Sequence, residues 1–158
     1  MRSSARIALP LVLSAALALP AAAETWERSF DITTRPELSI RTNDGSVQVD
    51  TWNRKAIGVR VVTTGWRIGS GGVTVDAHQV GDRVEVEART PRWSISFGFG
   101  HSVRIEVTVP ARTDLDIQTG DGSVTIRPLA GNIRARTGDG AISVSGLKGD
   151  VTLSSGDG

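Results

Sequence analysis

An eighteen-residue repeat at the end of the chain constrains its fold more than any other feature. The tripeptide Gly-Asp-Gly starts at Gly120, again at Gly138 and again at Gly156. When residues 120–137 are laid over residues 138–155, apolar residues fall on apolar residues and turn glycines on turn glycines. The matched apolar pairs are Val124 with Ile142, Ile126 with Val144, Leu129 with Leu147, Ile133 with Val151, and Ala135 with Leu153.

Within each repeat the apolar residues alternate with polar ones, which is the period-2 pattern of a half-buried strand. Each repeat therefore predicts two short strands and two tight turns. We expect the turn glycines to supply positive φ angles and the turn aspartates to bond to their own backbone. The predicted structural turn glycines are Gly45, Gly120, Gly122, Gly131, Gly138, Gly140, Gly149 and Gly156.

Two architectures fit this pattern. Asp-Gly between alternating strands is typical of an antiparallel hairpin, so an antiparallel meander or sandwich is the alternative. Repetition at a fixed period favours a parallel β-solenoid, in which equivalent residues of successive coils stack. We favour a solenoid with 18-residue coils, because a meander gives no reason for residue identity to recur at every second turn.

The sequence pattern of the repeat also occurs much earlier in the chain. Leu38–Val49 repeats the pattern of Leu115–Ile126. Between these segments, strands are predicted at Ala56–Thr64, Gly72–Ala77, Arg83–Ala88, Trp93–Phe97 and Ser102–Val109. The chain is thus predicted to be all-β, with an irregular β module at 24–110 leading into solenoid repeats at 111–158. The last repeat stops at its turn, so we expect an array incomplete at this end, followed by further coils or self-associating through its open edge.

Residues 1–23 have the pattern of a secretory signal peptide. Arg2 and Arg6 precede a short apolar run, and the small residues Ala21–Ala23 follow it. The run is too short to span a membrane, and the mature chain is expected to start at Glu24. Without the two arginines, the 18 basic residues become 16 against 17 acidic ones, a net charge of about −1. This balance excludes the large basic field of a nucleic-acid-binding protein.

The segment from Val109-Pro110-Ala111 through Thr119-Gly120-Asp121-Gly122 to Thr137-Gly138-Asp139-Gly140 resembles a bacterial family of exported β-strand-repeat proteins, known as "putative adhesins" of unknown function. The resemblance implies an extracytoplasmic β-solenoid, in the periplasm, on the cell surface or secreted. It carries over no catalytic residues. The leading function is therefore a non-catalytic envelope protein that adheres, scaffolds or binds a glycan or another envelope protein.

Two other functions remain open: a carbohydrate-active β-helix enzyme, and a periplasmic accessory of envelope-stress signalling. Asp114 and Asp116 share a strand face and are the carboxylate pair for the enzyme alternative. Stacking instead predicts that Asp116 lies beside Arg134 and Gln118 beside Arg136, as solvated cross-strand pairs. We expect no catalytic residue and no cofactor.

Metal and glycan binding have candidates of their own. Asp121, Asp139 and Asp157 would stack about 4.8 Å apart and are candidate calcium ligands, although we expect calcium to be dispensable. Four tryptophans, Trp26, Trp52, Trp66 and Trp93, are candidates for stacking on a sugar. The alternation of large apolar residues around Trp93 favours a core strand there.

Overall fold

A computed structural model describes residues 23–91 and 100–158. Residues 1–22 of the predicted signal peptide and the strand predicted at Trp93–Phe97 lie outside these ranges. The described residues form fourteen strands and no helix. The strands are β1 Ala23–Asp31, β2 Glu37–Asp44, β3 Ser46–Trp52, β4 Ala56–Thr64, β5 Thr74–Val80, β6 Arg83–Arg89, β7 Ser102–Pro110, β8 Asp114–Asp121, β9 Val124–Ile126, β10 Leu129–Ala130, β11 Ile133–Asp139, β12 Ile142–Val144, β13 Leu147–Lys148 and β14 Val151–Ser155. The all-β prediction is confirmed.

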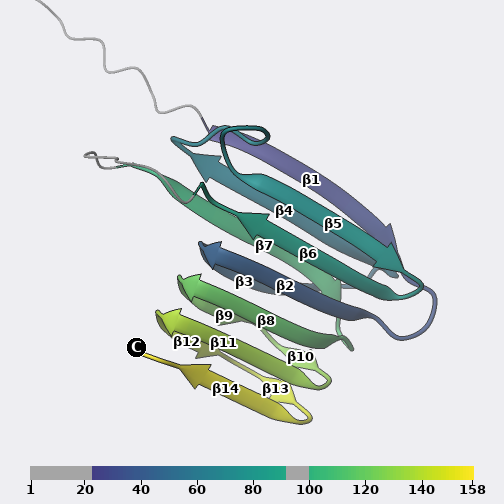
Figure 1. The fold of residues 1–158 in the computed structure, drawn as a ribbon. Helices are drawn as coiled ribbons and strands as arrows, with labels where there is room; N and C mark the ends of the chain where they lie inside the picture. The colour runs from purple at the N-terminus through teal and green to yellow at the C-terminus, as the bar shows by residue number, and fades with distance from the viewer. Residues whose placement is uncertain (1–22, 92–99) are drawn as a thin grey trace, which may run out of the picture.

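Two mixed sheets lie face to face (Figure 1). In the described ranges the first sheet has the order β1-β4-β7-β3-β9-β12, and the second has the order β14-β11-β8-β2-β6-β5. A small parallel pair, β10 and β13, lies between the ends of the longer strands. The pairs β1–β4, β4–β7 and β5–β6 are antiparallel, and the other strand pairs are parallel.

The repeats stack in register. Leu115 pairs with Ile133, Ile133 pairs with Val151, and Val124 pairs with Ile142, each at an offset of eighteen residues. The earlier copy of the pattern, at residues 38–49, belongs to the same stack, because Leu38 pairs with Leu115 and its strand β2 runs parallel to β8. The predicted match between residues 38–49 and 115–126 is therefore confirmed, although four strands lie between them in the chain.

The irregular part of the chain was predicted less completely. Strand β4 has the predicted bounds, and β6 and β7 extend one residue further than predicted. Strand β5 is shifted toward the C-terminus, and β1 was not predicted.

The core fills the space between the two sheets. Leu38, Ile40, Ile57, Ile105 and Ile117 are fully buried there, so residues on both sides of position 110 belong to one apolar cluster. The predicted division into a module at 24–110 and repeats at 111–158 stays a prediction.

The inward positions of the first regular repeat are confirmed, since Val124, Ile126, Leu129 and Ile133 are all buried. In the next repeats the prediction of burial is wrong for Val144, Val151 and Leu153, whose exposed fractions are 38%, 41% and 40%. Ile142 and Leu147 are only partly buried. A strand residue is covered by the strands on both sides of it, and β12 and β14 have a described neighbour on one side only. Of the polar residues that alternate with these apolar positions, Arg134, Arg136, Ser143 and Thr152 are exposed and Thr125 is half-buried.

The turn glycines are required by close stacking of backbones. A Cβ atom at Gly122 would collide with the carbonyl of Gly45, and one at Gly140 would collide with the carbonyl of Gly122. The predicted positive φ holds at Gly45, Gly131, Gly140 and Gly149 but is wrong for Gly120, Gly122, Gly138 and Gly156. At these last positions the neighbouring repeat, not the φ angle, leaves no room for a side chain.

A Thr or Ser residue precedes each Gly-Asp-Gly turn, and its hydroxyl donates a hydrogen bond to a turn carbonyl of the neighbouring repeat. Thr119 Oγ1 donates to the Gly45 carbonyl at 3.1 Å, Thr137 Oγ1 to the Gly122 carbonyl at 3.0 Å, and Ser155 Oγ to Gly140 O at 2.9 Å. In the described residues the carboxylates of Asp121, Asp139 and Asp157 form no side-chain hydrogen bond. The expectation that these aspartates bond to their own backbone is therefore wrong, and the hydroxyls fill that role.

Asp82, in the turn between β5 and β6, holds the loop between β1 and β2. Its carboxylate accepts hydrogen bonds from the backbone N–H groups of Thr33, Thr34 and Arg35 at 2.7–3.0 Å, and from the two threonine hydroxyls. The bond from the Thr33 N–H, followed by those from Thr34, holds the pKa of Asp82 far below its usual range. This contact fixes one end of the second sheet to the edge of the first.

The contribution of Asp82 to stability should therefore be full at neutral pH and fall in acid. A carboxyl whose pKa is lower in the folded chain stabilises that chain above the unfolded pKa, about 3.9, and loses this contribution as the pH falls through the folded value. Thermal unfolding between pH 7 and pH 2 should show Asp82→Asn melting below wild type at pH 7, with a smaller loss below about pH 4. Asp76→Asn, on the same hairpin, should follow the wild-type profile. Parallel profiles for wild type and Asp82→Asn would contradict this assignment.

Candidate functional site

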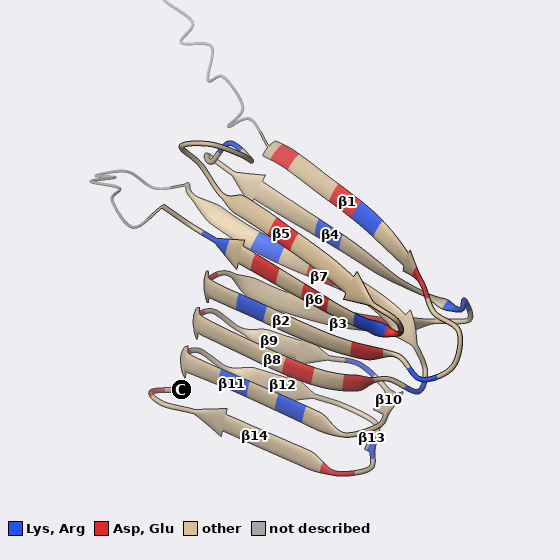
Figure 2. Ribbon diagram, turned by 45° about the vertical axis from the view of Figure 1, so that its right-hand side comes forward, with Lys and Arg blue, Asp and Glu red and all other residues tan. Residues whose placement is uncertain are grey.

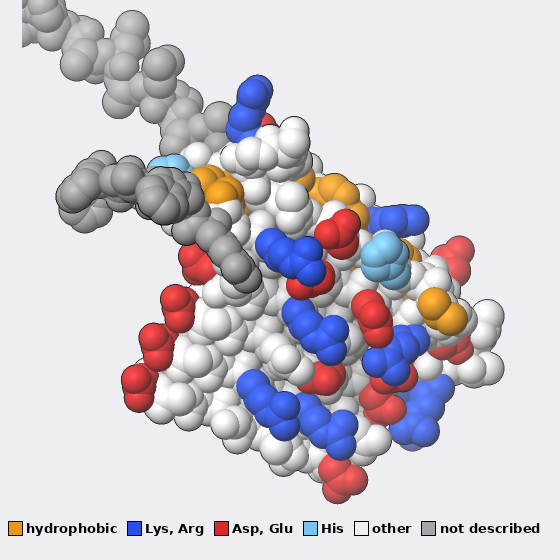
Figure 3. All heavy atoms as spheres, in the orientation of Figure 1, with side chains coloured by type: hydrophobic (Ala, Val, Ile, Leu, Met, Phe, Trp, Pro, Cys, Tyr) orange, Lys and Arg blue, Asp and Glu red, His pale blue; other side chains and the backbone are white. Residues whose placement is uncertain are grey.

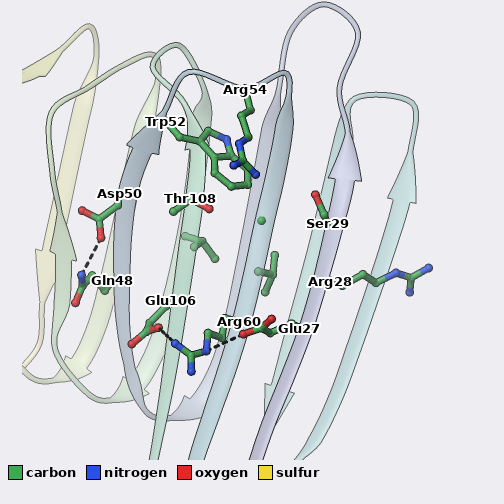
Figure 4. Close-up of a pocket in the computed structure, with 13 residues that line it drawn as sticks. Glu27, Arg28, Ser29, Gln48, Asp50, Trp52, Arg54, Arg60, Glu106 and Thr108 are labelled. Atoms are coloured by element: carbon green, nitrogen blue, oxygen red, sulfur yellow. Dashed lines mark hydrogen bonds and ion pairs between the residues drawn. The ribbon is translucent and has the colours of Figure 1, made fainter.

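A groove of about 580 Å³ lies on the outer face of the first sheet, over β1, β4, β7 and β3 (Figure 4). Its floor follows from the strand register. Ser29 pairs with Gly58, Gly58 pairs with Thr108, and Thr108 pairs with Asp50, so the small residues Ser29, Gly58 and Thr108 lie side by side across the sheet. This row forms the floor of a groove because the rows on both sides of it carry larger side chains.

The next row along the sheet forms one polar wall. Glu27, Arg60, Glu106 and Gln48 are cross-strand neighbours in that order. Arg60 lies between the two glutamates, with Nε 2.9 Å from Glu27 and Nη1 3.4 Å from Glu106 (Figure 4). This wall is therefore a fixed array of charged hydrogen-bonding groups, held by cross-strand ion pairs.

Trp52 forms the opposite wall. Its indole N–H donates to the Ala56 carbonyl at 2.7 Å, which fixes the ring at the end of β3. The ring lies against Gly58, where a Cβ atom would come within 2.8 Å of it. The guanidinium of Arg54 lies 5.0 Å from the ring centroid, a cation–π distance. On this side the groove is thus bordered by the apolar edge of the half-buried Trp52 ring and by the positive charge of Arg54.

The third side carries Asp50. Its carboxylate accepts a hydrogen bond from the Gln48 amide at 2.8 Å and lies 3.1 Å from Arg127 of the neighbouring repeat. Each carboxylate of the groove is thus engaged by an arginine. Such a surface can hold a polyhydroxylated ligand, because hydroxyl groups can both donate and accept and a sugar ring has an apolar face for an indole.

The predicted calcium ligands lie elsewhere, at the edge where β2, β8 and β11 end. Asp44 pairs with Asp121 and Asp121 pairs with Asp139, and an acidic column follows this edge of the molecule (Figure 3). Burial, and to a lesser extent the neighbouring Asp121, raises the pKa of Asp44. Across residues 23–91 and 100–158, no three acidic or histidine side chains gather closely enough to hold a metal ion. That calcium is dispensable stays a prediction.

The predicted carboxylate pair is engaged in structural contacts. Asp114 lies 2.7 Å from Arg35 and accepts a hydrogen bond from the Asn132 N–H at 2.8 Å. Asp116 pairs with Arg134, and Gln118 with Arg136, so the predicted register is confirmed. In the described chain, however, Asp116 and Arg134 do not approach within ion-pair distance, and Asp116 accepts a 3.5 Å bond from Gln118.

The other described tryptophans do not line the groove. Trp26 and Trp66 are partly buried against the core, and Trp66 packs against His101 with the two rings tilted by 52° and their centroids 4.5 Å apart. Of the groove residues, the sequence singled out Trp52 alone. Gly58 was the missed signal, since an isolated glycine inside a strand often marks a close approach of another group.

No family model and no curated protein matches the chain. Among solved structures, the fold is similar to that of a "putative cell adhesion protein" from Clostridium sporogenes, at a TM-score of 0.51 and 8% identity, covering 85% of this chain and 99% of that one. A "putative adhesin" from Bacteroides fragilis matches at a TM-score of 0.32 and 7% identity, covering 84% of this chain and 97% of that one. A "Putative lipid binding protein" from Parabacteroides distasonis matches at a TM-score of 0.35 and 13% identity, covering 85% of this chain and 62% of that one.

The resemblance to proteins named as adhesins, stated from the repeat motif, is thus confirmed as a likeness in fold. Within the described part of the chain, no helix is long and apolar enough to cross a membrane.

Proposed function

We propose that this protein is an extracytoplasmic, non-catalytic binding module of the adhesin type, in which residues 111–158 form a parallel β-solenoid continuing from the module at 24–110. The in-register pairs at an offset of eighteen residues support the solenoid. The basic start, apolar run and small residues of 1–23 support export with cleavage before Glu24.

The groove carries the proposal of binding. It combines an indole, a stacked arginine, an amide and ion-paired carboxylates around a floor of small residues. Rigid polar groups beside an aromatic side chain are typical of sites that orient a small ligand without reacting with it. We propose a glycan as this ligand, because its hydroxyls match the polar wall and its apolar C–H groups match the edge of Trp52.

The same geometry argues against glycoside cleavage. In the hydrolases, two carboxyl groups flank the scissile bond with open space between them. Here the guanidinium of Arg60 occupies the space between Glu27 and Glu106. Asp114, of the other candidate pair, is held by Arg35 and Asn132.

A glycan array of neutral oligosaccharides, probed with the mature protein, tests this function. We expect binding to at least one oligosaccharide, weakened about tenfold or more in Trp52→Ala and in Arg54→Gln. Arg67→Gln, an exposed charge outside the groove, should bind as wild type. Circular dichroism verifies the fold of each variant. Absence of binding across the array, or equal binding by the groove variants, would refute a glycan site here.

We also propose that the chain self-associates through β14. In the described structure this strand pairs with β11 alone, and its Val151 and Leu153 are exposed. Unpaired strand edges with apolar side chains recruit other strands, and lysine on an edge prevents this. Sedimentation velocity should show association rising with concentration, and Leu153→Lys should remain monomeric. A wild-type monomer at all concentrations would contradict the proposal.

A further inference from the structure

The outer face of the second sheet carries two kinds of arginine. Arg35, Arg83 and Arg89 are each paired with a carboxylate, at distances of 2.7, 2.9 and 2.6 Å. Arg41, Arg134 and Arg136 are exposed and form no ion pair with any described residue. We call these last three arginines the basic face.

The strand register fixes the spacing of the basic face. Arg41 on β2 and Arg136 on β11 are both paired with Gln118 of β8, so they lie in one row, two strand spacings or about 10 Å apart. Arg134 lies two residues before Arg136 and therefore on the same side of its strand. Figure 2 shows the basic positions on β2 and β11 and acidic positions on β8, the strand between them, and Figure 3 shows the basic side chains on this surface.

Carboxylates are interspersed with these arginines. Asp116 is the cross-strand neighbour of Arg134, and Glu87 is the neighbour of Arg41. Glu87 is held by Arg89, whose Nε and Nη2 donate to its two oxygens at 2.8 and 2.6 Å. With Glu87 neutralised in this way, the three arginines and Asp116 have a net charge of +2. Asp76 and Glu85 border Arg41 on the side of β6 and β5, so the excess positive charge is concentrated on the side of β11.

We propose that the basic face binds an acidic polysaccharide in which charged sugars alternate with uncharged ones. A guanidinium forms paired hydrogen bonds with a carboxylate. The spacing of about 10 Å between Arg41 and Arg136 leaves Gln118 between them, and its amide suits a neutral sugar. A densely charged polymer fits worse, because DNA carries a charge every 1.7 Å or so and would place phosphates against Asp116.

The experiment uses fluorescent hyaluronan oligosaccharides, which carry one carboxylate per disaccharide, with dextran, double-stranded DNA and phosphatidylglycerol vesicles as competitors. Residues at the paired positions of neighbouring strands suggest substitutions that the fold should tolerate. Arg134→Thr and Arg136→Ser introduce the residues that β14 has at the paired positions, Thr152 and Ser154. Arg41→Gln introduces the residue that β8 has there, Gln118.

We expect hyaluronan to bind, with an affinity that falls as salt rises from about 50 to about 200 mM, and dextran not to compete. The Arg134→Thr/Arg136→Ser double variant and Arg41→Gln should each lose affinity, the double variant by about tenfold. Lys55→Gln/Arg67→Gln removes the same charge elsewhere and should bind as wild type. Trp52→Ala should also bind as wild type, which separates this face from the groove.

Three results would overturn the inference. One is the absence of hyaluronan binding at low salt. Another is equal affinity of the wild type and the double variant. The third is tighter binding of DNA or vesicles through the same arginines, which would assign the face to a different class of partner.

Discussion

Ile117→Asp is expected to abolish cooperative folding. Ile117 is fully buried in β8, and strands on both sides of it contribute Ile40 and Ala135 at the paired positions. An uncompensated buried charge costs about 3–5 kcal/mol or more, against a total stability of about 5–15 kcal/mol for a domain. Urea unfolding followed by circular dichroism should show no cooperative transition for the variant.

Two comparisons make this test specific. Ile117→Val, which removes one methyl group, should cost about 0.5–1.5 kcal/mol and keep the transition. Ile142→Asp places the same charge at a partly buried position near the edge of the stack, so it should cost less than Ile117→Asp. Equal losses at positions 117 and 142 would mean that the end of the array is as well covered as its centre.

Gly122→Ala is expected to destabilise the stack by about 2–4 kcal/mol, a large effect for one methyl group. The added Cβ would collide with the carbonyl of Gly45, and both groups are backbone held by hydrogen bonds. The φ angle of Gly122 is not in the left-handed region, so the cost arises from the contact alone. Thermal unfolding of the variant measures it.

Gly81→Ala is the matched control. Gly81 has a φ of 60°, and a Cβ atom there would meet nothing within 4 Å. Its cost should therefore come from the left-handed backbone conformation alone and stay near 1 kcal/mol. If Gly122→Ala were no more destabilising than Gly81→Ala, the repeated glycines would have to be explained by turn conformation, as first predicted.

The regular repeats could be predicted because their information is local. Apolar alternation and an eighteen-residue period identify β8, β9, β11 and β12, and matching residues such as Leu38 and Leu115 give their register. Strand β1 was missed because its stretch Ala23–Asp31 has no apolar alternation. It forms a strand because it pairs along its whole length with β4, and this long-range pairing leaves no signal in the local sequence. The reason for the turn glycines was missed too, since it lies in the backbone of a neighbouring repeat.

The same difference between local and long-range information applies to the groove. Trp52 could be noticed from its residue type, but Glu27, Arg60 and Glu106 become neighbours only through the antiparallel register of β1, β4 and β7. No spacing in the sequence brings these three residues together. The acidic turns, by contrast, were identified because they repeat, and the structure places them in a column away from the groove.

The position of β2 and β3 has a consequence for how the chain is synthesised. These strands come early, yet their parallel partners β6, β7, β8 and β9 span residues 83–126. Folding therefore cannot advance step by step from the N-terminus, because the middle of both sheets must wait for later residues to arrive. Long-range parallel pairing of this kind is slow and leaves strand edges open during synthesis. A chain emerging from a ribosome or a translocation pore thus stays vulnerable to other copies of itself until β9, which ends at Ile126, has been released.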